Sequence, residues 1–61
     1  MSLQDFYRIV DYAYISVWKF DNKECKHMYI GDIDKLPNSL MDEIIIKISA
    51  FDVQSYNIII A

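Results

Sequence analysis

EIIIKISA at residues 43–50, followed by YNIIIA at residues 56–61, is the part of this sequence that decides the fold. β-Branched side chains fit the surface of a sheet and lose freedom in a helix, so both stretches are predicted strands. The five residues between them are enough to reverse the chain, which predicts an antiparallel hairpin. Alternation predicts a core side made by Ile44, Ile46, Ile48, Ile58 and Ile60, and an opposite side made by Ile45, Lys47, Ser49, Asn57 and Ile59.

The size and composition of the chain indicate one small folded domain, residues 1–61. A single cysteine excludes an internal disulfide, and no leader or long apolar run is visible, so we expect a cytoplasmic protein without a membrane anchor. The apolar fraction of 54% excludes disorder and exceeds what a small core easily hides, which favours a protein partner or a homodimer. The net charge of −3 disfavours direct binding to nucleic acid.

The upstream residues predict elements that cover or extend the isoleucine hairpin. Ser2 and Asp5 have the spacing of a helix capping box, which predicts a helix over residues 2–10. Strands are predicted over residues 12–20 and 25–30, and a short helix or turn over residues 37–42. The predicted fold class is therefore α+β, with an N-terminal helix packed on an antiparallel sheet of two β-hairpins.

The first hairpin has a predicted register, because only one pairing separates its aliphatic and aromatic side chains. Asn22 and Lys23 are placed at the tip of a two-residue loop, and the alternative is a longer loop of the same parity, because Asn-Lys is a poorer type I′ pair than Asn-Gly. The side toward the helix then contains the pairs Val17–Met28 and Ile15–Ile30. The other side contains the pairs Phe20–Cys25, Trp18–His27 and Ser16–Tyr29. Gly31 follows and is expected to have a positive φ.

Cys25 and His27 are the only candidates for a metal site, because alternation places them on one face of a strand. Structural zinc has four ligands, and the remaining ones would have to be nearby carboxylates. We favour the alternative in which Cys25 packs against Phe20 and His27 against Trp18, and predict no metal and no cofactor. No serine or cysteine has a base and an orienting group in a recognisable pattern, so we expect a protein that is not an enzyme.

Two surfaces are candidates for binding a partner. The first is an aromatic patch made by Tyr14, Trp18, Phe20 and Tyr29, with His27 beside it. Aromatic residues are enriched at binding hot spots, although internal packing would equally explain the patch. The second is an acidic cluster made by Asp32, Asp34, Asp42 and Glu43. It is either a solvated loop or a complement to a basic surface on a partner protein.

The segments Tyr29-Ile30-Gly31-Asp32 and Asp34-Lys35-Leu36-Pro37-x-x-Leu40-x-Asp42, with the final isoleucine hairpin, resemble small proteins of phages and mobile elements of Gram-positive bacteria. Some small acidic proteins of that kind are anti-CRISPR inhibitors, which bind the RNA-guided nuclease of type II systems. The resemblance implies an inhibitor acting in the cytoplasm of an infected or lysogenic host, and it assigns no role to any residue. The alternative is a homodimeric structural or accessory phage protein without catalytic activity.

Overall fold

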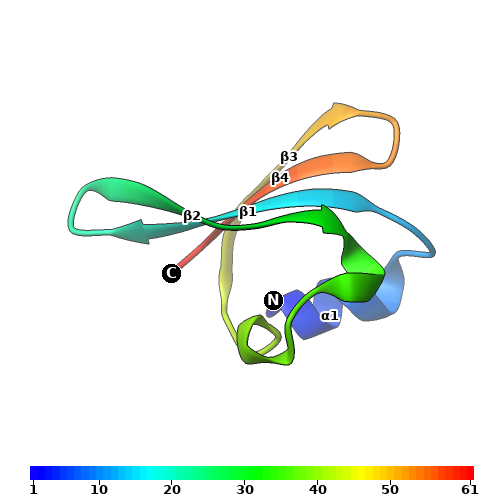
Figure 1. Ribbon diagram of the computed structural model, residues 1–61, viewed down its shortest axis with the longest axis horizontal. Helices are drawn as coiled ribbons and strands as arrows, with labels where there is room; N and C mark the ends of the chain where they lie inside the picture. The colour runs from blue at the N-terminus through cyan, green and yellow to red at the C-terminus, as the bar shows by residue number, and fades with distance from the viewer.

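The computed structural model describes all 61 residues and confirms the α+β class (Figure 1). In chain order the elements are α1 (Leu3–Ile9), β1 (Tyr14–Asp21), β2 (Glu24–Asp32), the 3-10 turns η1 (Ile33–Lys35) and η2 (Asn38–Leu40), β3 (Ile45–Asp52) and β4 (Ser55–Ile60). The predicted helix, both hairpins and the short helical segment between them are all present, with ends shifted by a few residues.

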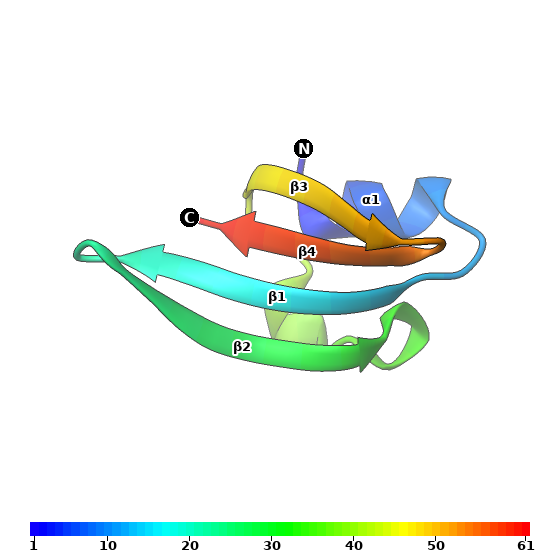
Figure 2. The same ribbon diagram turned by 90° about the horizontal axis from the view of Figure 1, so that it is seen from above.

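The four strands form one sheet in the order β2-β1-β4-β3. Each hairpin is antiparallel, but the two hairpins meet through β1 and β4, which run parallel. The sheet is therefore mixed rather than antiparallel throughout. The physical reason is the link of residues 33–44, which crosses one face of the sheet from the end of β2 to the start of β3, so that the two hairpin tips point to opposite ends (Figures 1 and 2).

The core lies between the central strands and a layer formed by α1 and the link. We call residues 1–13 and 33–44 the helix layer. The ten buried apolar residues are Leu3, Phe6, Ala13, Ile15, Val17, Ile33, Leu36, Leu40, Ile58 and Ile60. None of them belongs to β2 or β3; each of these edge strands contributes only one partly buried residue to the core, Tyr29 from β2 and Ile45 from β3.

The start of α1 has the predicted capping box. The Ser2 hydroxyl accepts a hydrogen bond from the Asp5 backbone N–H at 3.2 Å, and the Ser2 N–H donates to Asp5 Oδ2 at 3.0 Å. These two bonds satisfy donors that a helix of only seven residues would otherwise leave free.

The first hairpin follows the predicted register only near its tip. Asn22 and Lys23 both have positive φ, 46° and 67°, as a type I′ turn requires. The predicted pairs Phe20–Cys25 and Trp18–His27 are present. Beyond them a β-bulge adds Met28 to β2, so every later residue of that strand faces the side opposite to the predicted one.

Because of this bulge, the other three predicted pairs are wrong. The observed pairs are Val17–Tyr29, Ser16–Ile30 and Ile15–Gly31. Met28 and Ile30, expected under the helix, are exposed. Gly31, the single glycine of the chain, has a φ of 146°, which confirms the predicted positive φ.

The predicted core side of β3 is wrong at its start. A β-bulge at Ile46 makes Ile45 the residue that faces Ile60 and packs against the core. Ile44 and Ile46 are exposed, and Ile48 is exposed although it lies opposite the buried Ile58. The predictions for Ile58 and Ile60 are confirmed, because both belong to a central strand rather than to an edge.

Candidate functional site

One face of the sheet is not covered by the helix layer, and Figure 2 looks onto it. We call it the open face. Its side chains are those that alternate with the buried positions: Tyr14, Ser16, Trp18 and Phe20 on β1, Cys25, His27, Ile30 and Asp32 on β2, Lys47, Ser49 and Asp52 on β3, and Ser55, Asn57 and Ile59 on β4. All four strands thus contribute to a single surface.

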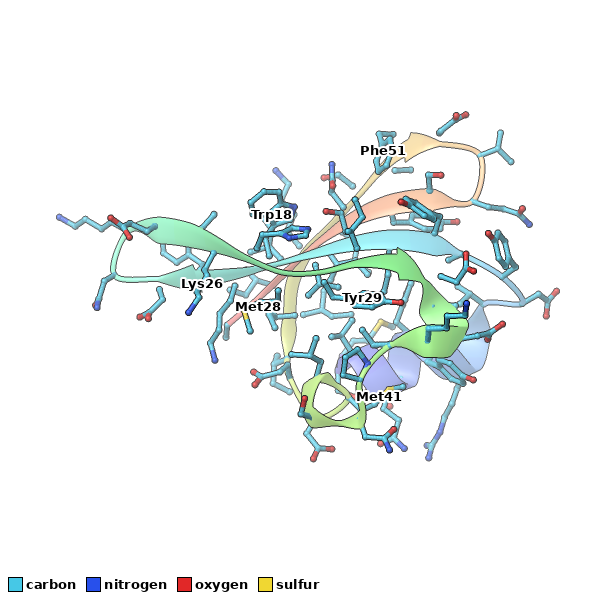
Figure 3. The ribbon with its side chains drawn as sticks, in the orientation of Figure 1. Trp18, Lys26, Met28, Tyr29, Met41 and Phe51 are labelled. Atoms are coloured by element: carbon cyan, nitrogen blue, oxygen red, sulfur yellow. The ribbon has the colours of Figure 1, made fainter.

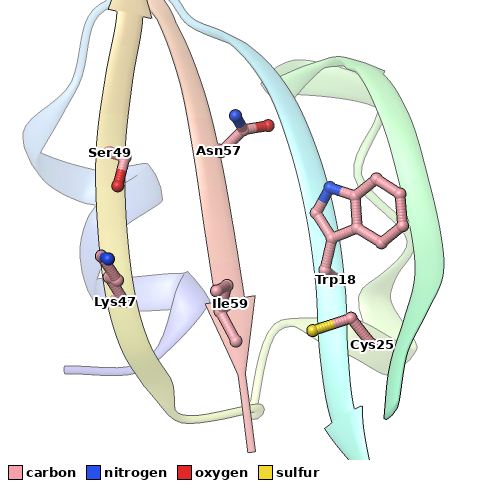
Figure 4. A pocket seen from close by; sticks show the side chains of 6 residues that line it. All are labelled: Trp18, Cys25, Lys47, Ser49, Asn57 and Ile59. Carbon is pink, nitrogen blue, oxygen red and sulfur yellow. The ribbon is translucent and has the colours of Figure 1, made fainter.

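The open face is hollowed by a groove of about 300 Å³ (Figure 4). Its lining residues are Trp18, Cys25, Lys47, Ser49, Asn57 and Ile59. Trp18 and Ile59 are direct neighbours in the parallel pair β1–β4, and Lys47 lies opposite Ile59 in the pair β3–β4. The groove therefore has an apolar middle, polar atoms from Ser49 and Asn57, and a cation on the β3 side.

Trp18 is held in place by neighbours on β1 and β2. Its ring packs edge-to-face on His27, with ring centroids 4.7 Å apart. His27 Nε2 lies 3.4 Å from the hydroxyl of Ser16, the only buried polar residue. These contacts give the Trp18 side chain a defined position, which favours its use as a rigid contact for a partner.

The predicted aromatic patch is only partly present. Tyr14, Trp18 and Phe20 share the open face, whereas Tyr29 lies on the other side of the sheet, opposite Val17 (Figure 3). The Tyr29 ring packs against the core, and its hydroxyl donates a hydrogen bond to the Asp32 carbonyl oxygen at 2.7 Å. Burial, and then the nearby Asp32 carboxylate, raise the pKa of Tyr29 above 10.0. Tyr29 is thus a packing residue and not part of the open face.

Two of the four predicted acidic residues, Asp32 and Glu43, have different neighbours, whereas Asp34 and Asp42 are exposed residues of the link. Asp32 lies beside Tyr14 and accepts a hydrogen bond from the Tyr12 hydroxyl at 2.9 Å, whereas Glu43 forms an ion pair of 3.8 Å with Lys19. Tyr14 and Lys19 are five residues apart on β1, a separation of roughly 16 Å. Asp32 and Glu43 thus lie beside different parts of β1.

The net charge is nevertheless distributed unevenly. The helix layer has five carboxylates, on Asp5, Asp11, Asp34, Asp42 and Glu43, against two cations, Arg8 and Lys35. The remaining residues, which form the two hairpins, have four side chains of each sign. The whole charge of −3 therefore belongs to the helix layer, and the sheet is electrically balanced.

The open face does not have the arrangement of a hydrolytic site. Ser16 is buried, and its neighbour His27 packs on Trp18 rather than on an orienting carboxylate. Cys25 lines the groove, and no group of three or more His, Cys, Asp or Glu side chains is close enough to hold a metal ion. The structure also contains no helix of the length and apolarity that a membrane span requires.

Sequence reasoning placed Lys47, Ser49, Asn57 and Ile59 away from the core but did not bring them to Trp18. The alternation along β3 and β4 was enough to predict that these four residues share a face. The sequence did not show that β4 lies beside β1, which is what brings them to Trp18. Comparison of the chain with protein-family models, curated proteins and solved structures finds no match, so a functional interpretation has to rest on the geometry of the open face.

Proposed function

We propose that this protein is a non-enzymatic binding module that docks the open face of its sheet on another protein and acts by occupying that partner's surface. The observation that supports this most directly is the groove beside Trp18, on a face that no segment of the chain covers. Small domains normally cover or charge such a face, and this one is hollowed, aromatic and electrically balanced.

The residues of the groove have the chemistry of a protein-binding hot spot. Tryptophan is among the residues most enriched at such sites, and the contact with His27 reduces the entropy that Trp18 loses on binding. Ser49 and Asn57 provide hydrogen-bonding groups that fix the orientation of an inserted side chain. A groove of about 300 Å³ lies at the lower end of the range for small-molecule sites and has room for one large side chain of the partner.

The narrower form of the proposal is an anti-CRISPR inhibitor of a type II RNA-guided nuclease. Such a nuclease holds its nucleic acids in a positively charged channel. A module attached through its balanced open face would present its acidic helix layer outward, where it would oppose the approach of DNA. This narrower form is supported by the sequence resemblance and by the charge distribution, in addition to the geometry of the groove.

The experiment is a binding and DNA-cleavage assay with a purified type II nuclease–guide complex. We expect the protein to bind the complex and to lower the cleavage rate. The variant Trp18→Ala should weaken binding by at least about tenfold, the size of a moderate hot spot. The matched control is Tyr7→Ala, which removes an exposed aromatic ring from α1, and should change binding less than about twofold.

The two forms of the proposal fail in different ways. Absence of binding to the nuclease would refute the narrower form of the proposal. If a partner does bind, equal effects of Trp18→Ala and Tyr7→Ala on its affinity would refute the claim that it binds the open face. The double variant Asp34→Lys/Asp42→Lys alters only exposed residues of the helix layer. It should leave the affinity for the partner nearly unchanged but weaken exclusion of DNA; loss of affinity instead would place the contact in the helix layer.

A further inference from the structure

The outer edge of β3 is unusually apolar for an unpaired strand. Residues Ile46, Ile48, Phe51 and Val53 are all exposed along it or at its tip. The residues before them are already paired, because the Ile45 N–H donates to the Met1 carbonyl at 2.8 Å and Ser2 forms a bridge with Ile44. The free edge therefore begins at Ile46, and apolar edges of this kind pair with another strand.

We propose that the β3 edge pairs with the β3 edge of a second copy of this chain, in antiparallel orientation about a two-fold axis through Ser49. Such an axis is perpendicular to the sheet, so it keeps the two open faces on the same side. Paired residues must then share a face. The bulges at Ile46 and Phe51 leave Lys47, Ile48, Ser49 and Ala50 as an uninterrupted stretch in which this condition is met.

The sequence of β3 is self-complementary in this arrangement. Ser49 meets its own copy, Ile48 meets Ala50, and Lys47 meets Asp52 of the second copy. Lys47 and Asp52 both lie on the open face, because the bulge at Phe51 restores the alternation between them. The symmetry produces this Lys47–Asp52 pair twice, so the charges on the edge attract rather than repel.

The apolar side chains are covered by the same pairing. The two bulged residues lie outside the ladder, which places Phe51 of one copy near Ile48 of the other and Ile46 near the tip residue Val53.

The second consequence of the pairing concerns the groove. Because Lys47 and Ser49 line it, the two grooves would lie on either side of the axis on one continuous eight-stranded face. This inference is independent of the proposed function, since it requires no other protein.

The test is the molar mass of the pure protein by size-exclusion chromatography with light scattering, over a series of concentrations. We expect a concentration-dependent approach to twice the chain mass of 7.2 kDa. Two variants are matched, because Ile46 and Ile30 are 58% and 56% exposed on the opposite edges of the sheet. Ile46→Lys should raise the dimer dissociation constant by at least about tenfold, and Ile30→Lys by less than about twofold.

Charge reversal tests the register. Lys47→Glu and Asp52→Lys each create repulsion at both pairs and should each weaken the dimer by about tenfold, whereas Lys47→Glu/Asp52→Lys together should restore it to within about threefold of the original. A chain that stays monomeric up to millimolar concentration, or equal weakening by Ile30→Lys, overturns the proposal. So does a mass that grows beyond the dimer, which would indicate head-to-tail pairing of β2 with β3.

Discussion

Gly31→Ala is the substitution whose cost follows most directly from the geometry. Gly31 has a φ of 146°, a region that side chains rarely allow. An added Cβ would lie 3.0 Å from the Tyr29 Oη and 3.4 Å from its Cζ. The substitution therefore strains the backbone and also pushes Tyr29 from the position in which its hydroxyl donates to the Asp32 carbonyl.

The expected magnitude combines these two costs. Backbone strain of this kind costs about 1–3 kcal/mol, and loss of the Tyr29 hydrogen bond about 1 kcal/mol. The total, about 2–4 kcal/mol, corresponds in a domain of this size to a fall in Tm on the order of 10–30 °C. Thermal unfolding measures the fall in Tm and urea unfolding measures the loss of unfolding free energy, both followed by far-UV circular dichroism at low protein concentration.

A double-mutant cycle with Tyr29→Phe separates the two costs, because this variant removes the Oη atom that the new Cβ would meet first. In that background Gly31→Ala should cost about 1 kcal/mol less than in the original protein. A cost below about 0.5 kcal/mol for Gly31→Ala alone would refute the strain argument. Equal costs in both backgrounds would refute the role given to Tyr29.

Three further predictions concern the core, the helix cap and the partly buried Tyr29. Ile58→Ala, at a fully buried position of β4, should destabilise the fold by about 2–5 kcal/mol in urea unfolding, and Ile46→Ala, at an exposed position of β3, by less than about 1 kcal/mol. Similar costs would contradict the placement of Ile46 outside the core. Hydrogen bonds from the Ser2 backbone and side chain lower the pKa of Asp5 below 3.8. The stability that the Asp5 carboxylate gives the fold is therefore present above pH 3.8 and is lost as the pH falls through the lowered pKa. NMR titration should detect that lowered pKa in the original protein and a return toward 3.8 in Ser2→Ala, which also costs about 1 kcal/mol of stability; an unchanged Asp5 titration would argue against the capping box. Tyr29 has a raised pKa, so its contribution is present below pH 10.0 and is lost as the pH rises through the higher value. The hydrogen bond to Asp32 also raises the pKa of Tyr12, so absorbance of tyrosinate against pH should show two late-titrating groups, of which Tyr29→Phe removes one. Persistence of both in that variant would contradict the raised pKa of Tyr29.

Local chemistry made several parts of this structure predictable. The Ser2–Asp5 spacing predicted the helix start, and the pairing of aliphatic with aliphatic side chains predicted Asn22-Lys23 as the first turn. Alternation along β1 predicted that Ile15 and Val17 face the core and that Trp18 faces away. These features depend on a few consecutive residues, so the sequence alone contains the information that they require.

The site depended on features that are not local. A single bulged residue, Met28, moved Tyr29 from the predicted aromatic patch to the core side, because one extra residue reverses the alternation of all that follow. Asp32 and Glu43 lie beside different parts of β1 because the link of residues 33–44 crosses the sheet instead of turning back at its edge.

The sequence by itself determined which segments are helix and strand and which side of β1 is buried, because side-chain alternation and capping are properties of neighbouring residues. The tertiary structure alone decided that β4 lies parallel to β1, and so that Lys47, Ser49, Asn57 and Ile59 surround a groove beside Trp18. The order of strands in a sheet is set by how the whole chain buries its apolar surface, and no stretch of residues encodes that competition locally.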